Sequence, residues 1–458
     1  MSLILTSSNT NLIIQTSLSL ILTLIFTFIK ISSFFLHGLH TYIHPDDVTP
    51  PNPNSNGIKA AIRRPGDPPE LRPRKKNHNK FEFDENKAQI FRLKLTHNQL
   101  QSRLYFDQFN GLFNFIIVAC FSLLIHIYLP VVSIGGSKSS SGVLLNGTLI
   151  PILLGFFGIC RIAFVSVKVS LERSASKNLD KNLSVLVGFL GTLFGFLIVS
   201  EVIPNWVFDF GIKFESLDGF AKFCVSVLMG FLAGILYVPA TKSARSYWLG
   251  TDQIRCNLSM IYCGWFGRML LYVSYLLTVF SSLLWIGPFA DLLVNKNIKM
   301  KNVKHTNNLV GNVGMSRSDF ENFRLCCLLA TGILQMLSLR ANLQMFLNEA
   351  VLSWYQRLHA SKVPDLDYSR AKVFLHNHYL CLAGIQFFSP PALVLLFLGL
   401  SRINDNVLDH FPALCNLVPC SALVKEMGVF MGWWVVLVSG VFVSVNLALY
   451  RQGIMYVS

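Results

Sequence analysis

The chain has 458 residues, of which 52% are hydrophobic and only 14% are charged, with a formal net charge of +15. Soluble domains are about a quarter charged, so these charges are too few to solvate the surface of a soluble protein of this length. The mean hydropathy of +0.49 fits a surface that faces lipid. The basic residues lie mostly between apolar runs, which indicates membrane topology and not nucleic-acid binding.

A helix that crosses a bilayer needs about 20 mostly apolar residues. The first such segment lies within residues 1–36; it lacks a basic start and a cleavage site, which indicates an uncleaved signal anchor. Residues 111–340 hold six further segments and residues 379–458 hold two, so we expect an all-α polytopic bundle of about nine spans. The expected spans are 12–33, 111–133, 148–168, 184–203, 220–239, 264–288, 323–340, 379–400 and 428–450.

The distribution of Lys and Arg predicts that the N-terminus lies outside and the C-terminus inside. In this orientation the cytosolic segments hold roughly two to three times as many Lys and Arg as the opposite loops. The loop 289–322 disagrees, because it is basic and falls on the outer side. Either this loop is too long for the positive-inside rule to apply to it, or one of the expected spans does not cross the membrane.

Two cytosolic segments, 37–110 and 341–378, are long. Residues 45–80 are Pro-rich and basic without apolar periodicity, which predicts a disordered linker. Residues 86–108 are expected to form an interfacial helix. Apolar residues at helical spacing predict that 341–378 begins with a helix that continues past the seventh span and stops near Pro364. This helix either binds or gates a partner, or packs on its own bundle.

Arg161 lies well inside the third expected span. A charge at this depth is costly, so it marks either an ion or substrate contact or a structural cation paired within the bundle. A voltage sensor carries basic residues at every third position, and this spacing is not found in Arg161, Lys168 and Arg173. Glu201, at the end of the fourth span, is the nearest candidate counter-charge.

Pro390 and Pro391 fall inside the eighth expected span. Proline removes a backbone donor and kinks a helix. Broken helices expose carbonyls that coordinate cations in transporters, whereas in other proteins such a kink only shapes the bundle. Gln386 and Ser389 offer polar groups that could satisfy the freed backbone or line a cavity.

The histidines form two clusters. His37, His40 and His44 would share one face if the first helix continued, and His376 and His378 precede the eighth span. Membrane di-iron oxidoreductases use such boxes, but these boxes are incomplete, and interfacial histidines are the competing interpretation. Because the sequence also lacks a Walker A motif, a nucleophile elbow and an HExxH motif, we expect no enzyme activity, no catalytic or metal site and no cofactor.

Two covalent modifications are expected on the outer side. Asn146 begins the sequon Asn146-Gly147-Thr148, although its closeness to the bilayer works against glycosylation. Cys415 and Cys420 share one short loop and could form a disulfide if that loop faces an oxidising lumen.

Three stretches resemble the transmembrane protein 161 family of polytopic eukaryotic membrane proteins. They are Tyr42-Ile43-His44-Pro45-Asp46-Asp47, the run from Leu343-Gln344 through Tyr379 to Gln386 and Pro390, and Gly230 to Pro239 with the polar turn through Arg245. The chain departs from the family by its basic Pro-rich insert and its short C-terminal tail. The resemblance implies an integral membrane protein without established enzyme activity, in a family linked in animals to cation currents, rhythm and stress protection.

We therefore expect a non-enzymatic membrane protein that modulates ion transport or a membrane partner. The alternatives are a transporter or channel with a pathway near Arg161 and the Pro390-Pro391 kink, and, more remotely, an oxidoreductase that uses the His clusters. The expected partners are the lipid bilayer and ion channels or other membrane proteins, without nucleic acid. The expected location is the plasma membrane or an endomembrane.

Overall fold

Nine helices of the computed structural model are long and apolar enough to cross a membrane, within the residues that the structure describes. Those residues are 7–43, 91–128, 149–172, 178–204, 207–210, 218–251, 263–294, 315–358, 366–402 and 422–456. The expectation of an all-α bundle with about nine spans is confirmed. The spanning helices are α1 (Ser7–Ile29), α5 (Phe106–Tyr128), α6 (Leu149–Leu171), α7 (Asn178–Val199), α8 (Gly219–Thr251), α10 (Trp265–Leu283), α12 (Arg317–Leu337), α15 (Leu380–Leu400) and α17 (Ala422–Arg451).

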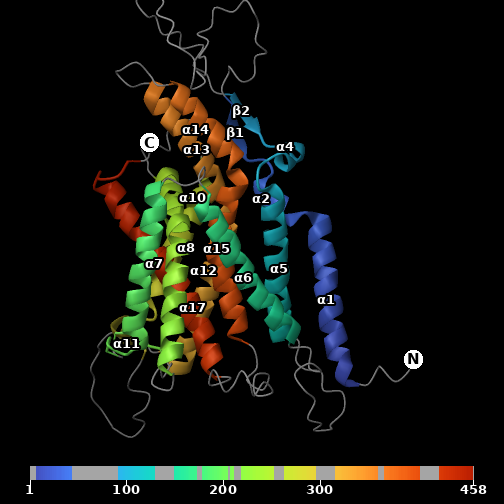
Figure 1. The fold of residues 1–458 in the computed structure, drawn as a ribbon, viewed down its shortest axis with the longest axis vertical. Coiled ribbons are helices and arrows are strands. Elements are labelled where there is room, and N and C mark those ends of the chain that lie inside the picture. The colour runs from blue at the N-terminus through green and yellow to red at the C-terminus, as the bar shows by residue number, and fades with distance from the viewer. Residues whose placement is uncertain are drawn as a thin grey trace, which may run out of the picture.

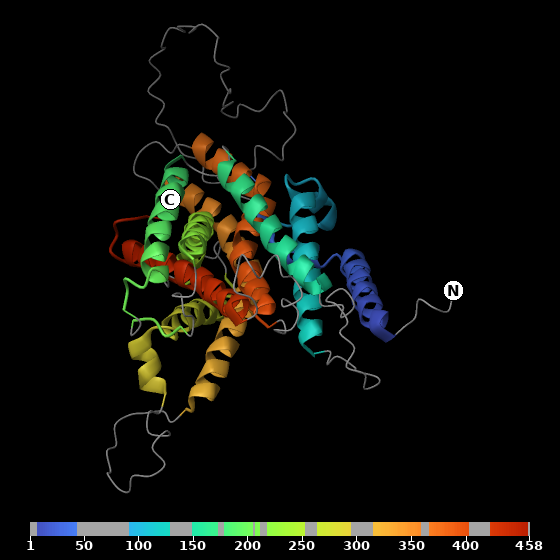
Figure 2. The same ribbon diagram turned by 60° about the horizontal axis from the view of Figure 1, so that its bottom comes forward.

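The centre of the bundle is α15, which packs against α5, α6, α12 and α17 (Figure 1). Its sequence is apolar on every face, which is typical of a helix buried among other helices, and 94% of its most apolar window is buried. By contrast α1 lies at the edge of the bundle beside α5 (Figure 2), and only 17% of its window is buried. Most of α1 is therefore free of contacts with the rest of the described bundle, and its role as a signal anchor stays a prediction.

Two adjacent tryptophans connect α17 to two neighbouring helices. The indole Nε1–H of Trp433 donates to the carbonyl of Ser282, and that of Trp434 donates to the carbonyl of Met229, at 3.0 and 2.9 Å. Both side chains are buried. Because a buried indole N–H needs an acceptor, these bonds fix the rotation of α17 against α8 and α10.

The helix α8 is much longer than its expected span of 220–239. Its 33 residues extend over about 50 Å at 1.5 Å per residue, whereas the hydrocarbon core of a bilayer is about 30 Å thick. The helix passes through Pro239 without ending and continues to Thr251. The last turns of α8 therefore carry Lys242 and Arg245 to one end of the bundle.

The same end of the bundle carries a polar cap, which we define as α2 (Ile31–Leu36), the strands β1 and β2, α4 (His97–Gln101), α13 (Leu339–Leu358) and α14 (Leu366–His378). In Figure 1 the cap lies at the top, near the end of α17. The expected helix after the seventh span is confirmed: α13 begins directly after α12, at Leu339. The helix α13 packs on its own bundle, where it contacts α8, α14 and α15 and is largely buried; binding or gating of a partner stays a prediction.

The expectation of one interfacial helix over 86–108 is wrong at residues 91–96, which are not helical. Phe91–Lys94 forms the strand β2, which pairs antiparallel with β1 (His40–Ile43), with His40 opposite Lys94 and Ile43 opposite Phe91. Only the five-residue helix α4 follows before α5 begins. The sequence between the strands, including the expected linker 45–80, lies outside the described residues.

Candidate functional site

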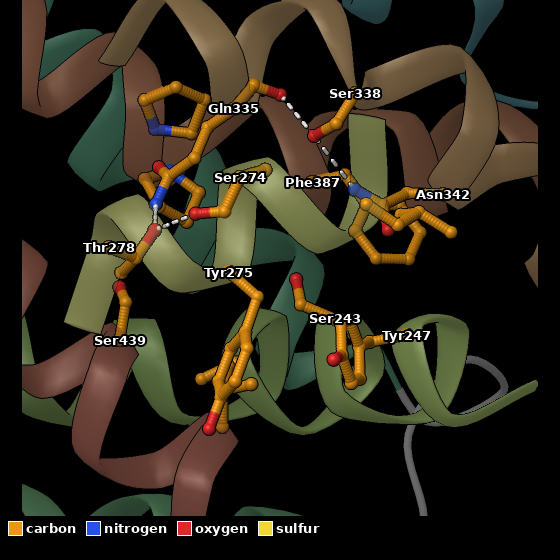
Figure 3. A pocket seen from close by; sticks show the side chains of 15 residues that line it. Ser243, Tyr247, Ser274, Tyr275, Thr278, Gln335, Ser338, Asn342, Phe387 and Ser439 are labelled. Atoms are coloured by element: carbon orange, nitrogen blue, oxygen red, sulfur yellow. Dashed lines mark hydrogen bonds between the residues drawn. The ribbon is translucent and has the colours of Figure 1, made fainter. Parts of the chain in front are cut away.

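A polar cavity of about 70 Å³ lies inside the bundle, between α8, α10, α12, α13, α15 and α17 (Figure 3). Hydroxyl and amide groups supply most of its polar surface, and no charged side chain lines it. Its walls are Ala240, Ser243, Tyr247, Leu271, Ser274, Tyr275, Thr278, Gln335, Ser338, Asn342, Phe387, Pro390, Pro391, Ser439 and Val443.

A chain of hydrogen bonds follows one wall of the cavity. Gln335 Nε2 donates to Thr278 Oγ1 at 2.9 Å, and Asn342 Nδ2 donates to Ser338 Oγ at 3.2 Å. The hydroxyl of Ser338 in turn donates to the carbonyl of Gln335 at 2.8 Å. These bonds connect α10 and α12 to the start of α13, as Figure 3 shows.

Two oxygen atoms on the cavity wall have no hydrogen-bond partner among the described residues: Gln335 Oε1 and Ser439 Oγ. A buried polar atom without a partner costs about 1–3 kcal/mol, and buried waters normally satisfy such atoms. The volume is sufficient for water or a small ion. The cavity is therefore uncharged, is lined by both polar and apolar side chains, and presents two oxygens that a water could satisfy.

Pro390 and Pro391 form part of the cavity wall. Because proline has no N–H, the carbonyls of Gln386 and Phe387 lose their usual donors four residues on, although α15 continues to Leu400. The proline pair therefore borders the cavity and leaves two carbonyls of α15 without their backbone donors. The amide of Gln386 itself is buried, and neither its oxygen nor its nitrogen has a partner among the described residues; it is not part of the cavity wall.

Next to the cavity, an ion cluster is centred on Glu349 of α13. Arg245 Nη1 and Lys372 Nζ each lie 3.8 Å from Glu349 Oε1. Lys242 lies over the ring of Phe346, 5.3 Å from its centroid, and this ring stacks on the imidazole of His376 at 4.5 Å. The cluster consists of Lys242, Arg245, Glu349, Lys372 and His376.

Burial and the neighbouring charges together set the protonation of Glu349 and His376. Burial opposes ionisation of Glu349, but the positive charges of Arg245, Lys372 and Lys242 outweigh burial and lower the pKa of this carboxyl. Burial lowers the pKa of His376 to about 4, and Lys372 and Lys242 act in the same direction, against Glu349. At neutral pH the cluster therefore holds a carboxylate and a neutral imidazole beside three basic side chains.

Hydrogen bonds join the strand β1 to the helices of the ion cluster. The backbone N–H of His40 donates to Gln344 Oε1 at 2.9 Å, and the Tyr42 hydroxyl donates to Asn348 Oδ1 at 2.8 Å. From α14, Asn377 Nδ2 donates to the carbonyl of Tyr42. Asn348 directly precedes Glu349, so β1 holds the part of α13 that carries the carboxylate.

Arg161 and Glu201 are not brought together as a pair. No ion pair joins them in the part of the chain that the structure describes. The guanidinium of Arg161 lies 5.0 Å from the ring centroid of Phe115 on α5 and beside Gly111. Glu201 follows the end of α7, with a positive φ of 57°. Neither residue is part of the cavity wall.

The histidine clusters lie in different settings. His37 follows the end of α2 and His40 belongs to β1, so they do not share a helix face. His376 is stacked in the ion cluster, and His378 stacks on Phe374. No group of three or more His, Cys, Asp or Glu within the described ranges could hold a metal. His44, Asn146, Cys415 and Cys420 lie outside the described residues.

The sequence interpretation missed the groups that define the site. The sequence pattern gives Glu349 no role, but this carboxylate is buried. One signal could have revealed it: Glu349 is the sole acidic residue between Arg340 and Pro364, in the middle of a helix whose other face is apolar. Ser439 and Thr278 carried no such signal, because single hydroxyls occur throughout membrane helices and usually bond the backbone one turn back.

A family model described as predicted transmembrane protein 161AB matches residues 162–406, more than half of the chain. The matched stretch begins within α6 and ends just beyond α15. It therefore includes all five residues of the ion cluster and the whole cavity wall except Ser439 and Val443 of α17. No curated protein and no solved structure matches the chain.

Proposed function

The chain belongs to the transmembrane protein 161AB family, and from this premise we propose that it is a non-enzymatic multi-pass membrane protein that modulates ion transport through a membrane partner. The observation that carries the proposal is the polar cavity beside Pro390 and Pro391. A protein that modulates a partner needs an element with two arrangements. A small hydrated space between α10, α12, α15 and α17 supplies room for these helices to move against one another.

The ion cluster supports the same proposal from the neighbouring end of the bundle. Asn342, on the cavity wall, and Glu349, in the cluster, are seven residues apart on α13, which places them two turns apart on one face. A shift of α13 would therefore change the cavity and the contacts of Glu349 with Arg245 and Lys372 together. The polar cap is the surface through which a partner would sense this shift.

The second candidate is a transporter or channel in its own right. Its support is the pair of cavity oxygens without a partner among the described residues, Gln335 Oε1 and Ser439 Oγ. They lie beside a helix in which two carbonyls lack their backbone donors, and free oxygens of this kind bind cations in transporters. In this form the pathway would pass the Pro390-Pro391 cavity and not Arg161, whose guanidinium lies against Phe115 on α5.

Two measurements on the full chain separate these functions. The first is ion flux into liposomes that contain only the purified protein; a modulator should give no more flux than empty liposomes. The second is the whole-cell cation current with and without the protein. Ser439→Leu, which fills the cavity, should abolish the change in current, while Val441→Leu, at a side chain 47% exposed on the same helix, should not.

Robust flux from the purified protein that Ser439→Leu abolishes would reject the modulator and establish the transporter. Flux that Arg161→Ala abolishes and Ser439→Leu leaves intact would restore a pathway at Arg161. If a folded Ser439→Leu variant changed the cell current as much as the wild type does, the cavity would have no part in the proposed mechanism.

A further inference from the structure

A second hollow of about 380 Å³ lies on the outside of the bundle, between α6, α7 and α8. It exists because the two flanking helices pack on different partners: α6 packs on α5 and α15, whereas α7 packs on α8. Figure 1 shows α6 slanting away from the upright α7. The space between them forms a groove, with α8 as its floor.

Glycines make the floor of this groove deep. Gly188 of α7 faces Gly230 and Gly234 of α8, and a Cβ at Gly234 would lie 3.1 Å from the carbonyl oxygen of Ser184. The two backbones therefore meet closely, and no side chain projects from these positions. Apolar side chains border the groove, including Val185, 75% exposed, and Phe231, 43% exposed, so the groove is open sideways to the surrounding lipid.

The two ends of the groove differ in polarity. At the end near the polar cap, Lys181 and Ser184 of α7 and Ser170 of α6 contribute an ammonium and two hydroxyls. At the other end the groove finishes at Thr192 and Val227. The groove is thus apolar along its length and has hydrogen-bond donors and positive charge at one end.

The length of the groove corresponds to one leaflet of a bilayer. Lys181 and Thr192 are eleven residues apart on α7, which is about 16 Å of helix. Half of a 30 Å hydrocarbon core is about 15 Å. An acyl chain of a phospholipid in that leaflet has the length and the chemistry to lie in the groove, with its phosphate at the level of Lys181.

We propose that the groove between α6, α7 and α8 binds one anionic phospholipid. One acyl chain lies over Gly188, Gly230 and Gly234, and the phosphate and anionic headgroup meet Lys181, Ser170 and Ser184. The ammonium of Lys181 attracts an anionic headgroup over a zwitterionic one, since each Lys or Arg near an anionic lipid surface contributes an attraction that corresponds to about a fivefold change in binding.

Native mass spectrometry of the purified full chain, titrated with phosphatidylglycerol or phosphatidylcholine of the same acyl chains, tests this proposal. The wild type should bind one phosphatidylglycerol in preference to phosphatidylcholine. Lys181→Glu should lower phosphatidylglycerol binding at least about fivefold and lower phosphatidylcholine binding by less, so that the preference for the anionic lipid is lost. Val227→Trp, which blocks the apolar end, should weaken both lipids.

Two variants serve as matched controls: Lys222→Glu, at the opposite end of α8, and Phe189→Trp, at an exposed position on α7 outside the groove. Both should bind as the wild type does. If Val227→Trp does not fold, Val185→Trp blocks the same groove from its rim. Equal binding of the two lipids by the wild type, tighter binding of a sterol than of phosphatidylglycerol, or unchanged binding in both groove variants would each overturn the proposal.

Discussion

Single charges in this protein differ widely in how much they stabilise the fold. Glu349 is 9% exposed and lies between Arg245 and Lys372, whose side chains are 27% and 13% exposed. Glu321, by contrast, pairs with Arg317 one helical turn away at the surface, and both side chains are about half exposed. Exposed pairs contribute little to stability, whereas removal of one partner of a buried pair leaves an uncompensated charge.

This contrast predicts the effect of Glu349→Gln. Loss of the carboxylate leaves Lys242, Arg245 and Lys372 close together without a counter-charge, so the free energy of unfolding should fall by about 2 kcal/mol. Thermal unfolding in detergent, followed by the loss of monodisperse protein, measures the effect. The matched substitution Glu321→Gln should change the apparent Tm by much less. Equal losses in the two variants would contradict the structural role of the ion cluster.

At the scale of secondary structure, the closest contact is between α7 and α8. Here Gly188 and Gly191 on α7 oppose Gly230 and Gly234 on α8, an arrangement of small residues that allows close helix packing in membranes. A Cβ on Gly230 would lie 1.8 Å from Thr192 Oγ1 and 2.5 Å from the carbonyl oxygen of Gly188. The second of these atoms belongs to the backbone and cannot move aside alone.

We therefore predict that Gly230→Ala separates α7 from α8. Overpacking of this kind costs about 1–3 kcal/mol, and it should lower the apparent Tm in detergent by several degrees. Gly219→Ala, at the start of α8, is the matched control, because a Cβ there meets nothing within 4 Å. A Gly230→Ala variant as stable as Gly219→Ala would show that α7 and α8 do not pack as described.

At the scale of the whole molecule, successive connections between the described spans lie at opposite ends of the bundle. The strands β1 and β2, on either side of residues 45–80, lie at the polar cap, whereas α15 ends and α17 begins at the opposite end of the bundle (Figure 1). The direction of this arrangement in the membrane stays a prediction from the Lys and Arg distribution, with the polar cap in the cytosol.

Glycosylation tags test this orientation. An acceptor sequence inserted within 45–80 should stay unmodified, and one inserted within 401–427 should be glycosylated, as judged by a mobility shift that a glycosidase removes. The reverse pattern would invert the orientation. Modification at both sites would contradict the placement of the flanking elements, β1 and β2 on one side and the end of α15 with the start of α17 on the other, at opposite ends of the bundle.

The spans could be predicted from the sequence because apolar length is a local property, visible in α6 or α17 without knowledge of any neighbour. The strand pair, the cavity and the ion cluster could not. β1 forms because His40 and Tyr42 meet Gln344 and Asn348, partners that no local pattern identifies. Arg161, which the sequence singled out by its depth, lies against Phe115, whereas Glu349, to which the sequence pattern gives no role, is at the centre of the ion cluster.

The contacts of β1 also set a limit on how early the polar cap can form during synthesis. β1 follows the first span in the chain, but its partners on α13 come 304 and 306 residues later. At about 5–20 residues per second of translation, these partners leave the ribosome about 15–60 s after β1 itself. During that interval β1 and the end of the first span lack the contacts with α13 that they make in the folded protein. The cap is thus among the last parts of the protein to assemble, after most of the spans have entered the membrane.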